Sequence, residues 1–410
     1  MEDKRLREYA KLAIKTGVNI QKGQLLIINA AVTANKFAEM CTEEAYKAGA
    51  SEVKIKWYDD YITKLTFENV DTEILKDVPQ YKIDEKKYEI DRGCAYLSIR
   101  DETPGNLKDV PSDKLQAVTS SQRAAFEPFR YYTMANEGQW CIVGHPNPTW
   151  AKKIFPDLNE DDAVEALWNA ILKASRVDGE NDPIEAWVKH NANIKKYSSK
   201  MNEYSFKTLH FTNGLGTDLY LDLAPNHIWA GGCDKTSKGV QFNPNIPTEE
   251  VFTAPRRTGV NGIVYGTKPL NYQGKLIEEF WIKFKDGKAV EFSAKKEESA
   301  LKNLIDLDEG SSYLGEVALI SHFSPISEMN ILFYNTLYDE NASCHLALGA
   351  AYPTNVVGGK DMSKEDLVKN DVNVSMAHSD FMFGSHDMKI VGIKDNGEKI
   401  QVFENGSFCI

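Results

Sequence analysis

The chain has 410 residues, a formal net charge of -12 at pH 7, 42% hydrophobic residues and 26% charged residues. This length exceeds what one hydrophobic core usually serves, so we expect two domains. The acidic balance argues against nucleic acid or an anionic membrane as the main partner, because both attract clustered lysine and arginine. The opening MEDKRL lacks the apolar core of a signal peptide and no apolar run approaches bilayer length, so a cytoplasmic location is expected.

Residues 1–200 alternate strands and helices. LLIINA and VKIKWY have the composition of buried strands, and the helix pattern NKFAEMCTEEAYKAG lies between them and stops at Gly49. A strand, a helix and a second strand within about 35 residues indicate a βαβ unit and therefore a parallel sheet. CAYLSI and QWCIVG are expected to add further strands. Helices are expected from about Asn159 and from Asp182 and Pro183, where an N-cap precedes proline.

Residues 201–410 are predicted to form a second, β-rich α+β domain. TLHFTNGLGTDLYLDL alternates apolar and polar residues around a turn, and FWIKFKDGKAVEF repeats this pattern around Asp-Gly, which is typical of antiparallel hairpins. One helix is expected at 297–306. No dinucleotide fingerprint or P-loop is present, and the six cysteines are scattered without a CxxC pair, so we expect neither a nucleotide site nor a zinc cage.

Acidic residues and histidines gather in four apolar or turn-like stretches of the second domain: 243–255, 311–323, 337–355 and 372–390. Glu316 occupies a strand position where an apolar residue would be expected, and a buried carboxylate needs a partner. The strand face predicted around it contains Leu314, Glu316, Ala318 and Ile320. A second predicted face contains Val372, Val374, Met376, His378 and Asp380, so its apolar part ends in an imidazole and a carboxylate.

His345 lies in an almost entirely apolar stretch and is expected to be buried. If this stretch is helical, Tyr352 lies seven residues further along on the same side, and the two side chains could face one cavity. A metal centre would satisfy several such buried groups at once, because carboxylates and neutral imidazoles are ligands for zinc, cobalt or manganese. The candidate ligands for two ions sharing a bridging carboxylate are Glu250, Glu316, Glu340, His345, His378 and Asp380.

Each candidate also has a purely structural interpretation. Glu250 beside Glu249 could be a solvated strand edge, Glu316 half of a buried ion pair, and Glu340 a helix cap. His345 could be a satisfied core histidine, and Tyr352 a core tyrosine with a bonded hydroxyl. The spacing alone does not decide, because no HExxH-type motif concentrates the ligands.

Four motifs follow one another along the chain: PTEEVFTAP, YLGEVAL, DENASCHLALG followed by tyrosine, and HSDFMFGS. Together they resemble the thermophilic metalloaminopeptidase family that includes aminopeptidases T, S and II. The resemblance extends over most of the chain and is strongest from 243 to 390. It implies a cytosolic, homodimeric exopeptidase with an α/β amino-terminal domain and a β-rich catalytic domain that binds two metal ions. Its substrates would be peptides with a free amino terminus.

By the same resemblance, Glu250, Glu316, His345, His378 and Asp380 bind metal, and Glu340 is a further ligand. Glu316 would also act as the catalytic base, and Tyr352 would stabilise the tetrahedral intermediate. His386 and Asp387 lie outside the motif and are expected to be a local surface feature.

The leading interpretation is therefore a dinuclear aminopeptidase. Two alternatives from other classes are a non-catalytic metal-binding or scaffold protein and a glycosidase that uses Glu250 and Glu316 as its acid pair.

Overall fold

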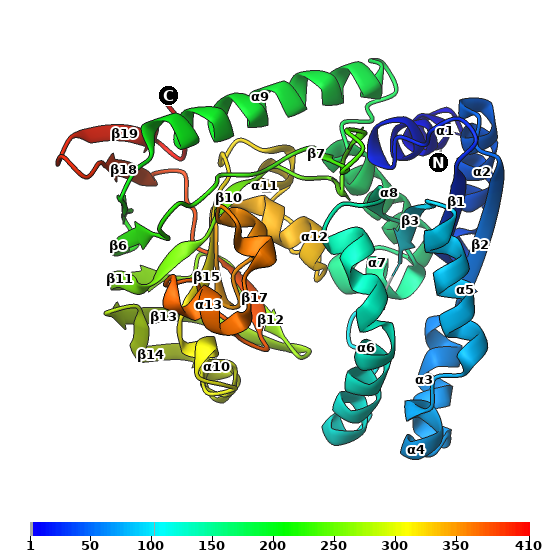
Figure 1. Cartoon of the computed structure of the whole chain (residues 1–410), viewed down its shortest axis with the longest axis horizontal. Helices are drawn as coiled ribbons and strands as arrows, with labels where there is room; N and C mark the ends of the chain where they lie inside the picture. The colour runs from blue at the N-terminus through cyan, green and yellow to red at the C-terminus, as the bar shows by residue number, and fades with distance from the viewer. Residues whose placement is uncertain (1–2, 102) are drawn as a thin grey trace. The chain divides into compact units, whose positions relative to one another are not determined.

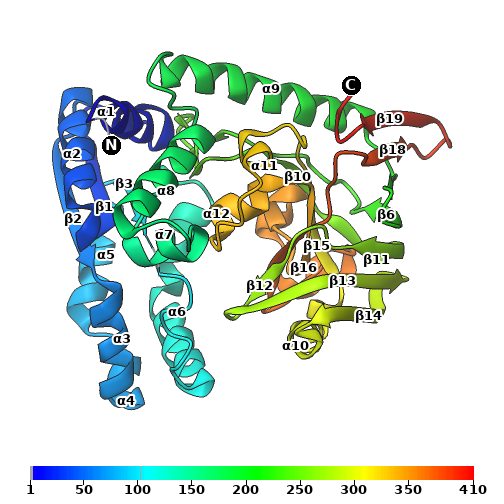
Figure 2. The ribbon, with the colours of Figure 1, turned by 180° about the vertical axis from the view of Figure 1, so that it is seen from behind.

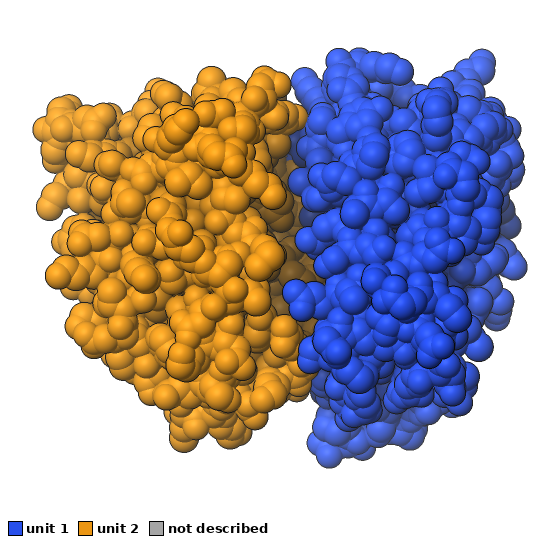
Figure 3. Space-filling model, turned by 60° about the horizontal axis from the view of Figure 1, so that its bottom comes forward, with its two compact units in different colours: residues 1–189, 233–247 blue, residues 190–232, 248–410 orange. Residues whose placement is uncertain are grey.

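The structure is a computed structural model that describes residues 3–101 and 103–410 (Figure 1). It divides into two compact units, residues 1–189 with 233–247 and residues 190–232 with 248–410 (Figure 3). The predicted division at residue 200 falls inside helix α9 (Pro183–Tyr204), which begins in the first unit and ends in the second. Residues 233–247 return to the first unit because strand β9 (Asn245–Ile246) pairs with β4.

The first unit is built on a parallel sheet with strand order β2-β1-β3-β4-β9. Its strands are β1 (Leu25–Ala31), β2 (Glu52–Tyr58), β3 (Ala95–Arg100), β4 (Trp140–Gly144) and β9. β1 pairs in parallel with both β2 and β3, which confirms the predicted βαβ unit. Helix α2 (Asn35–Ala48) connects β1 to β2 and ends where Gly49 adopts φ 100°, a left-handed conformation that glycine accepts without steric cost.

Helices α3 (Asp60–Asn69), α7 (Pro148–Ile154) and α8 (Glu160–Ala174) begin at side-chain caps that the sequence supplies. Asn159 accepts a hydrogen bond from Asp162 N at the start of α8, and Asn147 accepts one from Trp150 N at the start of α7. The remaining helices are α1 (Asp3–Leu12), α4 (Thr72–Lys76), α5 (Gln80–Asp91) and α6 (Ser112–Met134). A short two-stranded ribbon joins β7 (Asp234–Lys235) and β8 (Gln241–Phe242).

The second unit contains two antiparallel sheets. The larger has the order β12-β13-β11-β6-β5-β18-β19-β20, with β14 added to β13. Its strands are β5 (Thr208–Thr212), β6 (Asp218–Leu223), β11 (Pro255–Tyr265), β12 (Leu270–Tyr272), β13 (Lys275–Lys285), β14 (Lys288–Lys296), β18 (Lys389–Ile393), β19 (Lys399–Glu404) and β20 (Ser407–Phe408). Both predicted hairpins are present, as β5–β6 and β13–β14.

The smaller sheet has the order β10-β15-β16-β17. Figure 2 labels β10, β15 and β16, and Figure 1 labels β17. Its strands are β10 (Val251–Thr253), β15 (Leu314–Leu319), β16 (His345–Gly349) and β17 (His378–Met382). The helices of the second unit include α10 (Glu298–Ile305), α11 (Pro325–Met329), α12 (Thr336–Asp339) and α13 (Lys364–Lys369). The two sheets share one core, which contains Phe211, Leu221, Val260 and Phe280 from the larger and Val317, Leu346 and Phe381 from the smaller.

The parallel α/β unit and the β-rich second unit confirm the predicted fold class. Four of the six cysteines, Cys41, Cys94, Cys141 and Cys344, are buried, as expected for reduced thiols. Among the described helices, none combines the length and the apolar composition needed to cross a bilayer.

Candidate metal centre

Two of the predicted acids lie on one face of the smaller sheet because strand register aligns them. Glu316 of β15 pairs with Ala347 of β16, which pairs with Asp380 of β17. Directly paired residues of antiparallel strands point to the same side of the sheet, so the two carboxylates flank Ala347. The small alanine leaves the space between them open.

The two histidines join the same face because strand side chains alternate with a period of two. His345 precedes Ala347 by two residues on β16, and His378 precedes Asp380 by two residues on β17. The opposite face of these strands is apolar and belongs to the core; it contains Val317, Leu319, Leu346, Leu348, Phe381 and Phe383. One face of the sheet therefore packs into the apolar core, and the other face carries the ionisable side chains.

One predicted strand face was wrong at Leu314. The β15–β16 register shifts between Leu314 and Glu316, so Leu314 pairs with Leu348 and joins the apolar core instead of the face of Glu316. The irregularity is centred on Gly315, where a β-carbon would lie 2.3 Å from the backbone of Ala350. A period-two interpretation cannot anticipate a bulge that depends on this contact.

The structure also differs from a conditional helix and from one predicted strand face. The stretch after Cys344 is strand β16 and not a helix, so the helical spacing from His345 to Tyr352 does not apply. In the 372–390 stretch, the strand begins only at His378, and Met376 is 70% exposed. The apolar wall expected ahead of His378 is therefore absent at Met376, although His378 and Asp380 do share a face.

Glu250 reaches this face from the start of β10, the edge strand next to β15. Its Oε2 lies 3.5 Å from His345 Nε2, and only 14% of its side chain is exposed. The neighbouring Glu249 is 7% exposed and lies 3.8 Å from His190 Nε2, so the solvated strand-edge interpretation of this pair was wrong. Glu250, Glu316 and His345 each offer one ligand atom, and these atoms lie within 4.8 Å of one another.

Glu316 lies between the two histidines and is almost completely buried. Its Oε1 is 3.3 Å from His345 Nε2, and its Oε2 is 3.6 Å from His378 Nε2. Asp380 Oδ1 lies 3.4 Å from the same His378 nitrogen. The Glu316 carboxylate thus lies between two pairs of side chains, His345 with Glu250 on one side and His378 with Asp380 on the other.

Backbone carbonyls set the orientation of both imidazoles. Nδ1 of His378 lies 2.7 Å from the carbonyl oxygen of Ala350, and Nδ1 of His345 lies 3.3 Å from that of Ser343. Because a carbonyl oxygen only accepts hydrogen bonds, Nδ1 carries the proton in each contact. This leaves Nε2 of both rings directed at the carboxylates, an arrangement common around metal-binding histidines.

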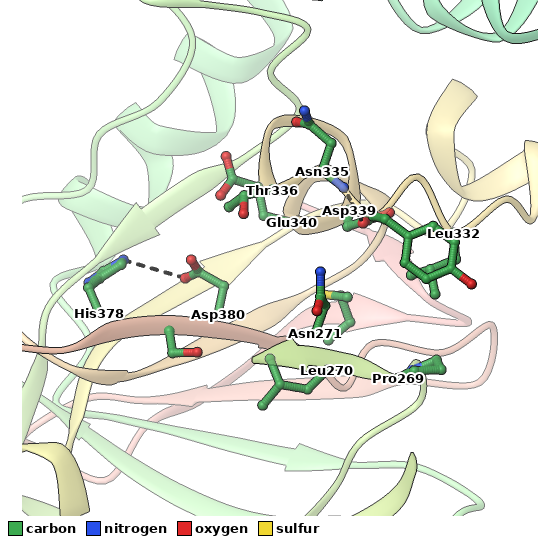
Figure 4. Close-up of a pocket in the computed structure, with 13 residues that line it drawn as sticks. Pro269, Leu270, Asn271, Leu332, Asn335, Thr336, Asp339, Glu340, His378 and Asp380 are labelled. Atoms are coloured by element: carbon green, nitrogen blue, oxygen red, sulfur yellow. Dashed lines mark hydrogen bonds and ion pairs between the residues drawn. The ribbon is translucent and has the colours of Figure 1, made fainter. Parts of the chain in front are cut away.

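Glu340 follows α12 and lines the same pocket as His378 and Asp380 (Figure 4). The fully buried Asn341 holds the adjoining backbone: its Oδ1 accepts a 2.7 Å hydrogen bond from Glu249 N, and its Nδ2 donates to Leu337 O at 3.0 Å. Asn341 therefore connects the segments that carry Glu250 and Glu340. Sequence reasoning missed this asparagine, whose only signal was its position directly after Glu340.

Tyr352 lies beside the cluster, with its ring centroid 4.9 Å from that of His378 in an edge-on arrangement. Its side chain is 41% exposed, so it is not the core tyrosine of the structural interpretation. Loss of hydration, followed by the negative charges of Glu316 and Asp380, raises the pKa of its phenol above the usual value. The hydroxyl therefore stays protonated and can donate a hydrogen bond.

The second histidine and aspartate pair lies apart from these contacts. His386 is exposed and its ring centroid is 6.1 Å from that of His322. Asp387 accepts hydrogen bonds from Ser385 Oγ at 2.6 Å and from Gly214 N at 2.7 Å, which lower the pKa of its carboxyl. These contacts describe a turn-stabilising aspartate with a surface histidine beside it.

Burial and charge repulsion both shift the pKa values of the groups in this cluster. Burial and then the charge of Glu316 raise the pKa of Glu250 to about 8, and burial with the charge of Asp380 raises the pKa of Glu340 well above its usual value. Burial alone would lower the pKa of both histidines, yet the facing carboxylates outweigh it and raise the pKa of His345 and of His378 to about 10. Without a cation, the cluster reduces its repulsion by holding protons.

The donor set fits divalent metal ions. The Nε2 atoms of the two imidazoles lie next to carboxylate oxygens of Glu250, Glu316 and Asp380. Oε2 of the buried Glu316 has no hydrogen-bond partner. Oxygen and imidazole nitrogen are the ligands that zinc, cobalt and manganese accept, and a dication would offset the excess negative charge that the protons now balance. The charge excess and the shared carboxylate both favour metal over a simple ion pair.

Comparisons with known proteins agree with this geometry. The chain is 42% identical over 405 residues to aminopeptidase AmpS of Bacillus subtilis (strain 168), covering 99% of this chain and 98% of that protein. It is also 42% identical over 407 residues to aminopeptidase 2 of Geobacillus stearothermophilus, with the same coverage. The solved structure of wild-type AmpT from Thermus thermophilus superposes with a TM-score of 0.91 at 35% identity, covering 99% of both chains.

The family model described as thermophilic metalloprotease (M29) matches residues 2–408, nearly the whole chain. The resemblance drawn from the four motifs is confirmed, and so is the assignment to the hydrolases. The chain belongs to the M29 family of thermophilic metalloproteases.

Proposed function

We propose that this chain is an aminopeptidase that releases amino-terminal residues from peptides with the help of two divalent metal ions. The observation that carries the proposal is Glu316, whose two oxygens face Nε2 of His345 and Nε2 of His378. One carboxylate between two nitrogen ligands is what two neighbouring ions need as a shared ligand. The names of the relatives, aminopeptidase AmpS and aminopeptidase 2, supply the reaction class.

The proposed ligands fall into two groups around Glu316. Glu250 and His345 lie on one side, and His378 and Asp380 lie on the other. Glu340 shares the pocket of the second group and is proposed as its further ligand. When bound, the ions would polarise the scissile carbonyl and lower the pKa of a water molecule. Zinc, cobalt and manganese all suit these oxygen and nitrogen donors.

Glu316 is also the proposed proton acceptor. Its central position brings it closest to both halves of the cluster, so a water molecule activated there would find this carboxylate within reach. Tyr352 is proposed to donate a hydrogen bond to the oxyanion of the tetrahedral intermediate, because its hydroxyl stays protonated beside His378.

The wider proposal includes a cytoplasmic homodimer, which rests on the family resemblance. The non-catalytic and glycosidase alternatives have no supporting observation beyond the acids already described, and membership of a peptidase family argues against both.

A free-amine requirement tests the proposal most simply. Metal-loaded protein should hydrolyse leucine amide and leave N-acetyl-leucine amide intact, since an aminopeptidase acts only at an unblocked amino terminus. Equal cleavage of both compounds would indicate a different peptidase specificity. Cleavage of neither, with metal bound, would support the non-catalytic alternative.

A further inference from the structure

A pocket of about 220 Å³ opens beside the metal centre within the second unit. At one end it is lined by His378, Asp380 and Glu340, and its lining continues over Leu270 and Asn271 to Pro269 and Leu332 (Figure 4). The pocket thus leads away from the proposed metal ligands toward an end that carries the aliphatic side chains of Pro269 and Leu332 beside Tyr334 and Asp339.

The walls of this pocket are fixed by the fold. Leu270 of β12 and Met382 of β17 are both about 4% exposed and form part of its lining. Strand β12 packs against β17, the strand that also carries His378 and Asp380. The reacting end and the aliphatic wall are therefore held by the same pair of strands.

A further wall of the pocket is the loop 332–335, which the buried carboxylate of Asp339 holds in place. Asp339 accepts hydrogen bonds from Phe333 N at 2.7 Å and from Asn335 N at 3.0 Å. Between these donors, Tyr334 has φ 57°, a left-handed conformation that is costly for a residue with a side chain. The loop 332–335 is thus held in a strained shape against the pocket, and Leu332 and Tyr334 line it.

The size and the chemistry of the pocket limit what it can hold. An apolar cavity of about 150 Å³ accommodates benzene, so this larger space has room for a side chain of the size of a phenyl group. Beyond the proposed metal ligands Glu340 and Asp380, the pocket is lined by the carboxylate of Asp339, and the lining residues include no lysine or arginine. An acidic side chain would lose its hydration there without gaining a cationic partner.

We propose that this pocket receives the side chain of the peptide's amino-terminal residue, accepts uncharged side chains up to the size of a phenyl ring, and disfavours acidic ones. The inference rests on the proposed aminopeptidase function. Leu332 is then a specificity-determining residue, because it closes the aliphatic end opposite the metal ligands (Figure 4).

The test compares alanine, leucine and phenylalanine amides on metal-loaded parent, Leu332→Trp and Leu332→Ala. Leu307→Trp is the matched control, because Leu307 is 45% exposed and lies outside the pocket lining. Filling the pocket with tryptophan should lower kcat/KM for phenylalanine amide at least about tenfold relative to alanine amide. Leu332→Ala should lower it for leucine amide several-fold relative to alanine amide, and the control should keep the parent's ratios.

Unchanged ratios in a folded, metal-containing Leu332→Trp would overturn the inference. If that variant does not fold, the ratio in Leu332→Ala decides. Glutamine and glutamate amides test the charge claim, since they are nearly equal in shape: the parent should favour glutamine amide at least about tenfold, and equal turnover would contradict the proposed pocket chemistry. A parent that hydrolyses no amino acid amide at all would instead refute the aminopeptidase proposal.

Discussion

Two buried glutamates, one in each unit, show what distinguishes a structural carboxylate from a reactive one. Glu89 in the first unit is 1% exposed; its Oε1 lies 2.5 Å from Lys56 Nζ, and its Oε2 accepts a 2.9 Å hydrogen bond from the Tyr96 hydroxyl. Glu316 in the second unit is 4% exposed, yet it faces two imidazoles within a group of four carboxylates. Both glutamates are buried, but Glu89 has a cationic partner, whereas Glu316 lies among other carboxylates.

The balance of charge decides what each site can do. Glu89 has a cation and a donor from its own unit, so its negative charge is compensated locally. Around Glu316 the carboxylates outnumber the imidazoles, so burial together with this excess of negative charge raises the pKa of Glu250 to about 8 and raises that of Glu340 well above its usual value. A cluster that can be neutralised only by bound protons or by cations from outside is suited to bind metal.

The largest contrast between the two glutamates should come from Glu316→Gln. The amide keeps the shape of the side chain but removes the shared anionic ligand and the proposed proton acceptor. We expect turnover of leucine amide to fall at least about a thousandfold, with loss of bound metal. Glu89→Gln should keep the parent's metal content and turnover. A similar loss in both variants would mean that metal binding and turnover do not depend specifically on the cluster around Glu316.

Tyr352→Phe separates chemistry from metal binding within the second unit. Deleting the hydroxyl removes one donor to the oxyanion, which typically costs about 2.7 to 4 kcal/mol, or about a hundred- to a thousandfold in turnover. The ring and its contact with His378 are retained, so metal content should match the parent by elemental analysis. A fall in kcat with little change in KM is the expected signature. Full turnover would assign Tyr352 to packing alone.

The two histidine and aspartate pairs of the 372–390 stretch should differ next. His378→Ala removes a nitrogen next to Glu316 and Asp380 and should weaken metal affinity at least about a hundredfold, measured by competition with a chelator. His386→Ala changes an exposed side chain outside the cluster and should alter affinity only slightly. Equal losses would contradict the assignment of the second pair to the surface.

The smallest effect is expected for stability in the first unit. Glu89→Gln leaves Lys56 without its buried anionic partner and weakens the hydrogen bond from Tyr96. We expect the free energy of unfolding to fall by about 1 to 3 kcal/mol, measured by denaturant titration. The matched variant Glu85→Gln should cost less, since Glu85 pairs with the same lysine at the surface. An unchanged unfolding midpoint for Glu89→Gln would show that its charge is not needed for folding.

Local features of the fold were predictable where one segment contains its own signal. The βαβ unit and both hairpins follow from periodicity, and the N-cap at Asn159 follows from residue type. The bulge at Gly315 and the return of 245–246 to the first sheet were missed, because each depends on a contact with a distant segment. Strand β16 was ambiguous for the same reason, since a short apolar run fits either a buried strand or a helix.

The candidate site was predictable residue by residue but not as an arrangement. Glu316 and His345 stand out in sequence because they interrupt apolar stretches, and HSD stands out through its composition. That Glu316 lies between the two histidines follows only from the strand order β10-β15-β16-β17 and its register. Asn341 and the pocket at Leu332 depend on loops whose shape the sequence pattern does not encode.

The most direct test of the central claim is the metal content of the protein before and after chelation, measured together with turnover of leucine amide. With the proposed dinuclear centre we expect two divalent ions per chain, loss of activity as both are removed, and recovery when cobalt, zinc or manganese is added back. Because Nε2 of His345 and of His378 would exchange a proton for a metal, rebinding should release protons and weaken as pH falls. Full turnover in protein verified to be free of metal would contradict the account.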